Sequence, residues 1–446
     1  MQSPAVKAAT QVTAELRTGV WHGDEPFTLY FPEEWEATVH WPHTPPPLSD
    51  AQIAERLESP VAQPAIRELC RGKSRPLVIV DDLSRPTPVD RLMPFLLRHF
   101  QEAGIPPRDV RILIATGTHP APDKISAERK IGKAAAEECQ LIIHDAHAQL
   151  VEVGKSSFGT PVFVNQEVVS SDFVLGIGGL YPNFTAGFGG GSKLALGVLG
   201  FRSIRHLHYR HPSMGWGYAD AGHSFRRDVD EIAHMINLRS MVTVQVNPLR
   251  EVIRLACGDP SLFFRDELAF ARKTFSAPPP GDADVVISNA YPNDLSLTTV
   301  HMKGITPLQC CAPEASRIVL AACSEGLGSH GIAPIANRPT LYRLRQIARR
   351  LATMEPRDVL RKIMHHGHAR SVSRNRIWLY RPVSHGPDFP LQLPGFQVTF
   401  SWQQVLEAVR SEHPGKRHLR AVLYPCSPLQ FLAEPQLSPD SHLPRV

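Results

Sequence analysis

The strongest constraint on the fold is an alternation of apolar, strand-like runs with helical stretches, which begins at Pro76. The short runs are rich in aliphatic and β-branched residues and predict buried strands, whereas the longer stretches between them carry helical periodicity. Parallel strands need such crossover connections, so this βαβαβ order predicts a parallel sheet covered by helices. The expected strands are 77–80, 110–115 and 141–144, and the expected helices are 89–103 and 124–138.

A glycine-rich segment follows the next apolar strand, 173–177. It is too long for a simple turn and too apolar for a disordered linker, so we expect a binding loop that leads into a helix. The proline run 278–280 then interrupts the pattern and marks a domain boundary. Strand and helix signals return at 284–288, 317–322, 340–350 and 398–400, and the proline-rich stretch 41–47 is expected to be extended surface chain.

These segments predict an α/β fold of two domains with largely parallel sheets and an active site in the interdomain crevice. The N-terminal domain, 1–278, is expected to hold the binding and catalytic residues. The C-terminal domain spans 281–412, and the tail, 413–446, can return to the N-terminal domain.

Composition restricts the class of protein. With 446 residues, 42% of them hydrophobic, the chain can bury the cores of two or three domains. The net charge of +5 is spread without long basic runs, which fits a small anionic ligand better than nucleic acid, although a mildly basic solvated surface needs no ligand and is the better explanation of the charge alone. Seven scattered cysteines without a CxxC pair, and no apolar run long enough for a signal peptide or a membrane span, predict a reduced cytoplasmic protein with no membrane partner.

Two polar motifs directly follow predicted strands, at the carboxyl ends where open parallel sheets bind ligands. The first, 81–88 (DDLSRPTP), contains Arg85, which can hold a carboxylate or phosphate through two parallel hydrogen bonds. Its Asp82 and Ser84 have an alternative interpretation as caps of the next helix. The second, 117–119 (GTH), offers an imidazole that can exchange a proton near neutral pH, and its position favours catalysis over a structural role.

The glycine-rich segment matches neither of the common nucleotide-binding patterns. Tyr181 and Ser192 stand where a dinucleotide fingerprint needs its last glycine, and Leu194 stands where a P-loop needs Ser or Thr. What remains is flexible backbone that delivers Lys193 among apolar residues. Desolvation there would lower the pKa of the amine and make it a nucleophile, and a phosphate-contacting lysine at a helix start is the alternative.

The segment 205–211 (RHLHYRH) is rich in histidine. On a strand His206 and His208 share a face, and on a helix His208 and His211 do. Imidazole is a good ligand for nickel, zinc or copper, so this segment is a candidate metal site, with a histidine-rich surface helix as the alternative.

Four ordered motifs resemble the lactate racemase family: 81–88, 117–119, 182–193 (PNFTAGFGGGSK) and 291–294 (YPND). The likeness covers nearly the whole chain. It implies a racemase or epimerase of a 2-hydroxy acid, which transfers a hydride from substrate C2 through a 2-oxo acid intermediate. It also implies a nickel-pincer nucleotide, the Ni complex of a pyridinium-3,5-bisthiocarboxylic acid mononucleotide, supplied by cofactor-synthesis proteins.

The resemblance assigns roles around that cofactor and its nickel. Lys193 corresponds to the lysine that forms a thioamide with the cofactor, and His208, fifteen residues later, corresponds to the nickel ligand, with His206 and His211 as alternatives. Further residues expected beside the cofactor are Asp82, Ser84, Gly189, Gly190 and Gly191.

The resemblance also assigns roles at the substrate, and it breaks at one of them. His119 corresponds to one of two acid/base histidines, Arg85 to the residue that positions the substrate carboxylate, and Lys303 to a second-domain lysine at the same site. Asn183 stands where the family has its second acid/base histidine, and an amide can orient the substrate but cannot exchange a proton.

Near Lys303 the chain has Thr298, Thr299 and Val300 in place of the family's Tyr-Gln pair, which implies a substrate other than, or as well as, lactate. Tyr181, His301 or a water could replace the missing imidazole. The alternatives are a one-base hydroxy-acid redox enzyme with the same cofactor and a non-catalytic pincer-binding protein. A nicotinamide dehydrogenase is disfavoured by the broken fingerprints.

Overall fold

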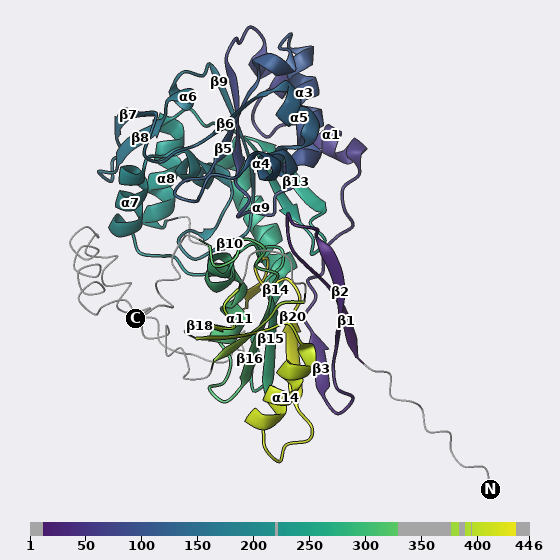
Figure 1. Ribbon diagram of the computed structural model, residues 1–446. Helices are drawn as coiled ribbons and strands as arrows, with labels where there is room; N and C mark the ends of the chain where they lie inside the picture. Colours follow the sequence, from purple (N-terminus) through teal and green to yellow (C-terminus); the bar gives the residue numbers. More distant parts are fainter. Residues whose placement is uncertain (1–11, 219–221, 329–375, 383–388, 394, 434–446) are drawn as a thin grey trace, which may run out of the picture. The chain divides into compact units, whose positions relative to one another are not determined.

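The structure is a computed structural model that describes residues 12–218, 222–328, 376–382, 389–393 and 395–433. The chain divides into two compact units. The large unit contains the described residues from 43 to 275, and the small unit contains 12–42, 276–328 and the described residues from 376 onward. Each unit has its own central sheet (Figure 1).

The large unit is built on a six-stranded sheet with the order β13-β12-β9-β4-β5-β6. All neighbours are parallel except β12 and β13. Every residue of the central strands is buried, because helices cover both faces, and the sequence of these strands is therefore a continuous apolar run. The strands are β4 (Pro76–Asp81), β5 (Arg111–Ala115), β6 (Gln140–Ile143), β9 (Phe173–Gly179), β12 (Ser240–Val246) and β13 (Val252–Gly258).

Side chains alternate along these strands and therefore feed two separate hydrophobic cores. Val78 and Val80 pack with α1, α2, α3, α4 and α5, whereas Leu77 and Ile79 pack with η2, α7, α8 and α9. The helices are α1 (Asp50–Glu58), α2 (Ile66–Cys70), α3 (Val89–Glu102), η1 (Pro107–Asp109), α4 (Lys124–Ile131), α5 (Lys133–Glu138), α6 (Gln166–Val169), η2 (Gly191–Val198), α7 (Phe201–Arg210), α8 (Ser224–Met235) and α9 (Pro260–Phe275). Two hairpins, β7 (Leu150–Lys155) with β8 (Pro161–Asn165) and β10 (Pro182–Asn183) with β11 (Gly187–Phe188), complete this unit.

The small unit has a seven-stranded sheet with the order β18-β19-β17-β16-β15-β20-β3, parallel except at β18. Its core joins β15, β16 and β20 to α14 and to the hairpin of β1 and β2. The elements are β1 (Thr13–Thr18), β2 (Glu25–Tyr30), β3 (Glu36–Val39), β14 (Ser276–Ala277), β15 (Val285–Asn289), α10 (Leu297–Thr299), the π-helix η3 (Val300–Gly304), α11 (Thr306–Gln309), β16 (Ser316–Leu320), β17 (Ile377–Tyr380), β18 (Gln392–Leu393), β19 (Phe396–Thr399), α14 (Trp402–Glu412), β20 (Arg420–Tyr424) and β21 (Phe431–Leu432).

The two-domain α/β class with largely parallel sheets is confirmed. One predicted helix is wrong in detail, because 124–138 is divided at Gly132, whose φ of +87° ends α4 and starts α5. The proline-rich stretch 41–47 forms no helix or strand and is largely exposed, as expected of surface chain. The helix expected at 340–350 lies outside the described residues.

The division into units differs from the sequence-based boundaries at both ends of the chain. The sequence places residues from 1 onward in the N-terminal domain, but β3 pairs with β20, so 12–42 belongs to the small unit. The tail, as far as residue 433, belongs to the small unit, because β20 lies between β15 and β3 in the small sheet. These pairings join segments almost 400 residues apart, which local sequence patterns cannot reveal.

All seven cysteines are free thiols, and five of them are buried. Within the described part of the chain, no helix is both long enough and apolar enough to cross a membrane.

Candidate active site

Three predicted motifs meet at one edge of the large sheet, because β9, β4 and β5 are parallel neighbours and each motif follows the carboxyl end of its strand. Hydrogen bonds join the three loops. Gly179 N donates to Asp81 Oδ2 at 3.1 Å, which joins the glycine-rich segment to the loop after β4. Gly117 N donates to Gly197 O at 2.9 Å, which joins the loop after β5 to η2.

A chain of polar side chains runs along this edge from Arg85 to His119. Arg85 Nη1 donates to Ser84 Oγ at 2.7 Å, and Ser84 Oγ donates to Asp82 Oδ1 at 2.6 Å. The other oxygen, Asp82 Oδ2, lies 2.6 Å from His119 Nδ1. Burial acts to raise the pKa of Asp82, but the His119 imidazole, Arg85 and Ser84 outweigh it and hold that pKa well below its usual value. An ionised Asp82 therefore accepts a hydrogen bond from Nδ1–H of His119, so Nε2 is the ring nitrogen that can accept a proton.

The neighbouring carboxylate, Asp81, has a structural role. It forms an ion pair of 2.7 Å with Lys130, whose side chain is completely buried, and accepts a hydrogen bond of 2.5 Å from Thr87. Lys130 also donates to the carbonyl oxygens of Arg85 and Thr87, at 3.1 and 3.0 Å. This buried lysine on α4 thus fixes the backbone that carries Asp82 and Arg85. It was missed by sequence reasoning, because nothing local marks a helical lysine as buried.

The glycine-rich segment forms the β10–β11 hairpin and then η2. Asn183 closes the hairpin with its side-chain oxygen, which accepts hydrogen bonds from Thr185 N and Ala186 N, both at 3.0 Å. A side chain at Gly187 is impossible without rearrangement, because its Cβ would lie 1.7 Å from Tyr218 O. Gly190, with φ of +78°, turns the chain into the helix that carries Lys193.

Lys193 has the property predicted from its surroundings. Burial, with Arg85 and Arg226 as neighbouring positive charges, lowers the pKa of its amine to about 7, against a smaller opposing effect of Asp82. A large share of this amine is therefore a neutral nucleophile at neutral pH. Arg226, on α8, was not identified from the sequence, because only the packing of α8 against η2 brings it near the loop.

The histidine-rich segment is the helix α7, so the helical interpretation of its spacing applies. His208 is exposed and its Nδ1 bonds Ile204 O at 2.7 Å, which leaves Nε2 as the nitrogen with a lone pair. His211 is fully buried and uses both ring nitrogens, with Asp228 Oδ2 at 2.8 Å and Ser224 Oγ at 2.9 Å.

The other two histidines of interest in this unit are also held by neighbours. His206 Nδ1 lies 3.1 Å from Thr160 Oγ1. The buried His144 places its ring nitrogens 3.0 Å from Leu199 O and 3.1 Å from Asn165 Nδ2, which is a structural role. Of His206, His208 and His211, only His208 is exposed, and its Nδ1 hydrogen bond to a backbone carbonyl defines its tautomer.

The YPND motif lies in the small unit. Its Asp294 accepts hydrogen bonds from Thr18 Oγ1 at 2.8 Å and from the backbone N–H groups of Gly19, Val20 and Ala322, so it is structural. Its Asn293 accepts a hydrogen bond of 2.9 Å from Lys303 Nζ, which is largely buried on η3. Thr298 Oγ1 donates to Leu327 O at 2.9 Å.

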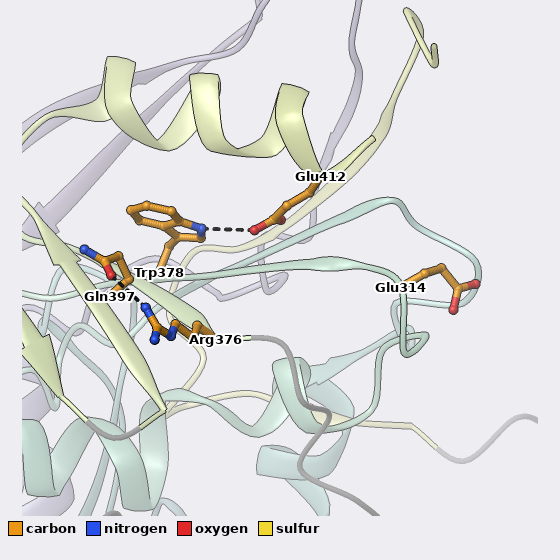
Figure 2. Close-up of a pocket in the computed structure, with 5 residues that line it drawn as sticks. All are labelled: Glu314, Arg376, Trp378, Gln397 and Glu412. Carbon is orange, nitrogen blue, oxygen red and sulfur yellow. Dashed lines mark hydrogen bonds between the residues drawn. The ribbon is translucent and has the colours of Figure 1, made fainter. Parts of the chain in front are cut away.

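A hollow of about 500 Å³ in the small unit lies at the amino ends of β16, β17 and β19, opposite the edge where parallel sheets bind ligands (Figure 2). Its walls are joined by hydrogen bonds from Trp378 to Glu412, at 3.3 Å, and from Arg376 to Gln397, at 3.4 Å. We interpret these side chains as links between the strands and α14.

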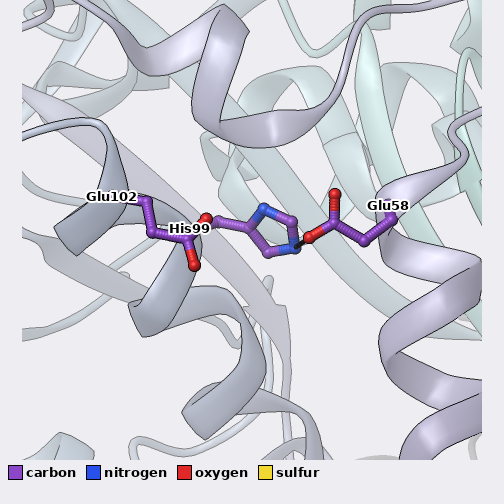
Figure 3. Close-up of side chains that lie close together, drawn as sticks. All are labelled: Glu58, His99 and Glu102. Carbon is purple, nitrogen blue, oxygen red and sulfur yellow. Dashed lines mark ion pairs between the residues drawn. The ribbon is translucent and has the colours of Figure 1, made fainter.

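A cluster on the large unit joins Glu58, His99 and Glu102, whose potential ligand atoms lie within 4.8 Å of one another (Figure 3). Arg67 already pairs with Glu58 and lies 4.0 Å from Glu102, so a guanidinium supplies the positive charge that a metal would bring. We interpret this cluster as a clamp between α1, α2 and α3.

The fold and the site together define an α/β protein with a histidine–carboxylate pair, an arginine and a low-pKa lysine at the carboxyl edge of a parallel sheet. Residues 22–217 match the lactate racemase N-terminal domain family. The lactate racemase of Thermoanaerobacterium thermosaccharolyticum is 27% identical over 333 residues, 72% of this chain and 74% of that protein. The lactate racemase of Lactiplantibacillus plantarum is 26% identical over 295 residues, 64% of this chain and 69% of that protein.

Solved structures show the same fold. The lactate racemase apoprotein from T. thermosaccharolyticum matches with a TM-score of 0.68 at 19% identity, over 94% of this chain and 100% of that chain. A Thermotoga maritima crystal structure matches with a TM-score of 0.59 at 14% identity, over 87% of this chain and 100% of that chain. Residues 22–217 thus match a lactate racemase domain, and the chain is similar in sequence to two lactate racemases and in fold to a lactate racemase apoprotein.

Proposed function

We propose that the protein is a racemase or epimerase of a 2-hydroxy acid that uses the nickel-pincer nucleotide. The observation that carries this proposal is that Asp82 and His119 are hydrogen-bonded to each other, and that their loops are hydrogen-bonded through Asp81 and Gly117 to the segment that contains Lys193. This arrangement brings an oriented base, His119, and a nucleophilic amine, Lys193, to the same sheet edge. The family resemblance assigns proton transfer to the first and attachment of the cofactor to the second.

The residues present fit the cofactor. A thioamide needs a neutral amine, and the pKa of Lys193, lowered to about 7 by burial, provides one. Nickel needs an imidazole lone pair, and the hydrogen bond from His208 Nδ1 to Ile204 O defines the tautomer that carries its lone pair on Nε2. The cofactor would be held by Lys193 and His208, with Asp82, Ser84 and the glycines 189–191 beside it. It would be delivered by cofactor-synthesis proteins.

When bound, the cofactor supplies a hydride acceptor. The chain supplies proton transfer and orientation. His119 takes the hydroxyl proton of the substrate at Nε2, and Asp82 holds the ring in the required tautomer. Arg85, already fixed by Ser84, binds the substrate carboxylate. Lys303, held by Asn293, is proposed to contact the substrate on the strength of the family resemblance.

Because of Asn183, we expect the two enantiomers of the substrate to be converted at unequal rates. Its side-chain oxygen is committed to the hairpin turn, so only its amide N–H groups can serve the substrate oxygen, and these do not exchange protons in this range. Tyr181 does not replace the missing base. Burial, with the charge of Asp81, raises the pKa of its phenol well above the usual value, and the hydroxyl lies 3.3 Å from Thr87 Oγ1.

This amide also favours a second candidate function, a hydroxy-acid redox enzyme that uses the same cofactor with one base. A protein that binds the cofactor without catalysis remains the third. The locked turn of Asn183 is the feature that separates the first two, because a racemase must serve both faces of a planar intermediate.

The test is expression together with the cofactor-synthesis proteins, followed by chiral chromatography of a panel of 2-hydroxy acids. A racemase converts either enantiomer of one substrate to the same mixture. A one-base redox enzyme consumes one enantiomer and forms the 2-oxo acid, in at most one equivalent per bound cofactor unless a second electron acceptor is added to take up the hydride. A loaded protein that leaves the whole panel unchanged would contradict both catalytic functions.

A further inference from the structure

Arg226 is a buried arginine to which neither the motifs nor the family resemblance gave a role. It lies on α8 and only 6% of it is exposed. Its guanidinium carbon lies 3.8 Å from the centre of the Phe264 ring, and its Nη2 donates to Gly190 O at 3.2 Å. The side chain therefore rests on α9 and holds the residue that precedes η2.

One turn further along α8, Asp230 holds the same loop from a second point. It accepts a hydrogen bond from the Ser192 hydroxyl, and its Oδ1 lies 3.8 Å from Arg226 Nε. Gly191, between the two anchor points, packs so closely that a Cβ there would lie 3.0 Å from Phe264 Cδ2 and 3.3 Å from Arg226 Nη2. The backbone of 190–192 is thus clamped directly before Lys193.

Arg226 also contributes to the electrostatic environment of the Lys193 amine. Three charged groups act on the Lys193 amine: Arg85 and Asp82 from the loop after β4, and Arg226 from α8. Burial lowers the pKa of Arg226 to about 10, so it remains a cation at neutral pH. Its Nη1 is buried and has no hydrogen-bond partner among the described residues. Such a cation is poorly screened, because little water reaches it.

We propose that Arg226 is a positioning residue for Lys193: it fixes the loop that presents the amine, and its charge favours the neutral, nucleophilic form. This inference rests on the proposed function only for the identity of the electrophile that Lys193 attacks. The state of the amine itself can be measured without cofactor. The amine of an ordinary lysine at the protein surface would be almost fully protonated near neutral pH and would react slowly.

The experiment is competitive labelling of the full-length, cofactor-free protein with a trace of acetic anhydride from about pH 5 to about pH 10. Mass spectrometry of the peptide that contains Lys193 gives the midpoint of its reactivity. We expect a midpoint near 7 in the wild type. Arg226→Gln keeps a hydrogen-bond donor for Gly190 but removes the charge. We expect it to raise the midpoint by about 1 pH unit, which corresponds to up to about tenfold less neutral amine at a given pH.

Arg227→Gln is the matched control, because it removes the same charge from the next residue of α8, which is exposed and lies over Phe158. Its midpoint should equal that of the wild type. Arg226→Lys keeps the charge and should retain most of the low midpoint, which a purely structural role would not predict. An unchanged midpoint in a folded Arg226→Gln protein overturns the proposal.

Arg226→Met, which keeps the length of the side chain and its packing on the Phe264 ring but removes the charge, provides a second variant if Arg226→Gln does not fold. Its midpoint should also rise, and an unchanged midpoint there counts against the proposal in the same way. The outcome is separate from that of the proposed function. A low, Arg226-dependent midpoint in a protein that never forms a cofactor adduct would support this inference and contradict the function.

Discussion

Asp82→Asn is the substitution that most directly tests the reaction scheme. The contact of 2.6 Å between Asp82 Oδ2 and His119 Nδ1 joins an ionised carboxylate to an imidazole N–H. An amide of the same shape can present N–H to Nδ1 instead, and the ring then carries its proton on Nε2, where the base is needed. The variant therefore keeps the packing and loses the productive tautomer.

The size of the effect follows from this geometry. A hydrogen bond to a charged group contributes about 1.5–3 kcal/mol, and loss of general-base catalysis costs about 10²–10⁴-fold in rate. We expect kcat of the loaded enzyme to fall within that range with little change in KM, because Arg85 still binds the carboxylate. Nitrogen-15 NMR of His119 in the cofactor-free protein should show the proton move from Nδ1 to Nε2.

Asp123→Asn is the matched control. Asp123 caps α4 by accepting a hydrogen bond of 2.7 Å from Ser126 N, and Asn is an equally good cap. Its activity and stability should stay near those of the wild type. A loss of less than about threefold in kcat for Asp82→Asn would be far smaller than the rate factor that general-base catalysis usually contributes. That result would mean that His119 is not the base that the scheme requires.

The Asp82 carboxylate should also make the free energy of unfolding depend on pH. Because the folded pKa of Asp82 is depressed, its contribution is fully present above the unfolded pKa, about 3.9, and is lost as pH falls through the folded value. The difference in thermal stability between wild type and Asp82→Asn should therefore shrink below about pH 4. A difference that stays constant from neutral pH to acid would contradict the depressed pKa.

The remaining predictions concern the cofactor and the missing base. Lys193→Ala should abolish the covalent cofactor adduct, and intact-mass spectra showing the wild-type adduct in this variant would reject the anchor. His208→Ala should lose nickel in metal analysis while His206→Ala, on the same helix, largely retains it; equal retention would place the ligand elsewhere. Wild type should turn over one enantiomer more slowly than the other, and Asn183→His should speed the slow direction, so equal turnover in both proteins would assign the second role to another residue.

Much of the large unit could be predicted from the sequence because its signals are local. The strands β4, β5 and β9 are continuous apolar runs that end directly before polar motifs, and a parallel sheet brings such carboxyl ends to one edge. The lowered pKa of Lys193 followed from apolar neighbours within the same segment. The motifs of the candidate site could therefore be identified from the amino-acid sequence alone.

The tertiary structure decided what depends on distant partners. Residues 12–42 and 413–433 join the small unit because β3 and β20 pair across almost the whole chain. Lys130 and Arg226 became part of the site only because α4 and α8 pack against the loops that carry Arg85 and Lys193. Helix packing sets such contacts at separations where sequence periodicity carries no information, so the motifs were predictable from the chain and their supports were not.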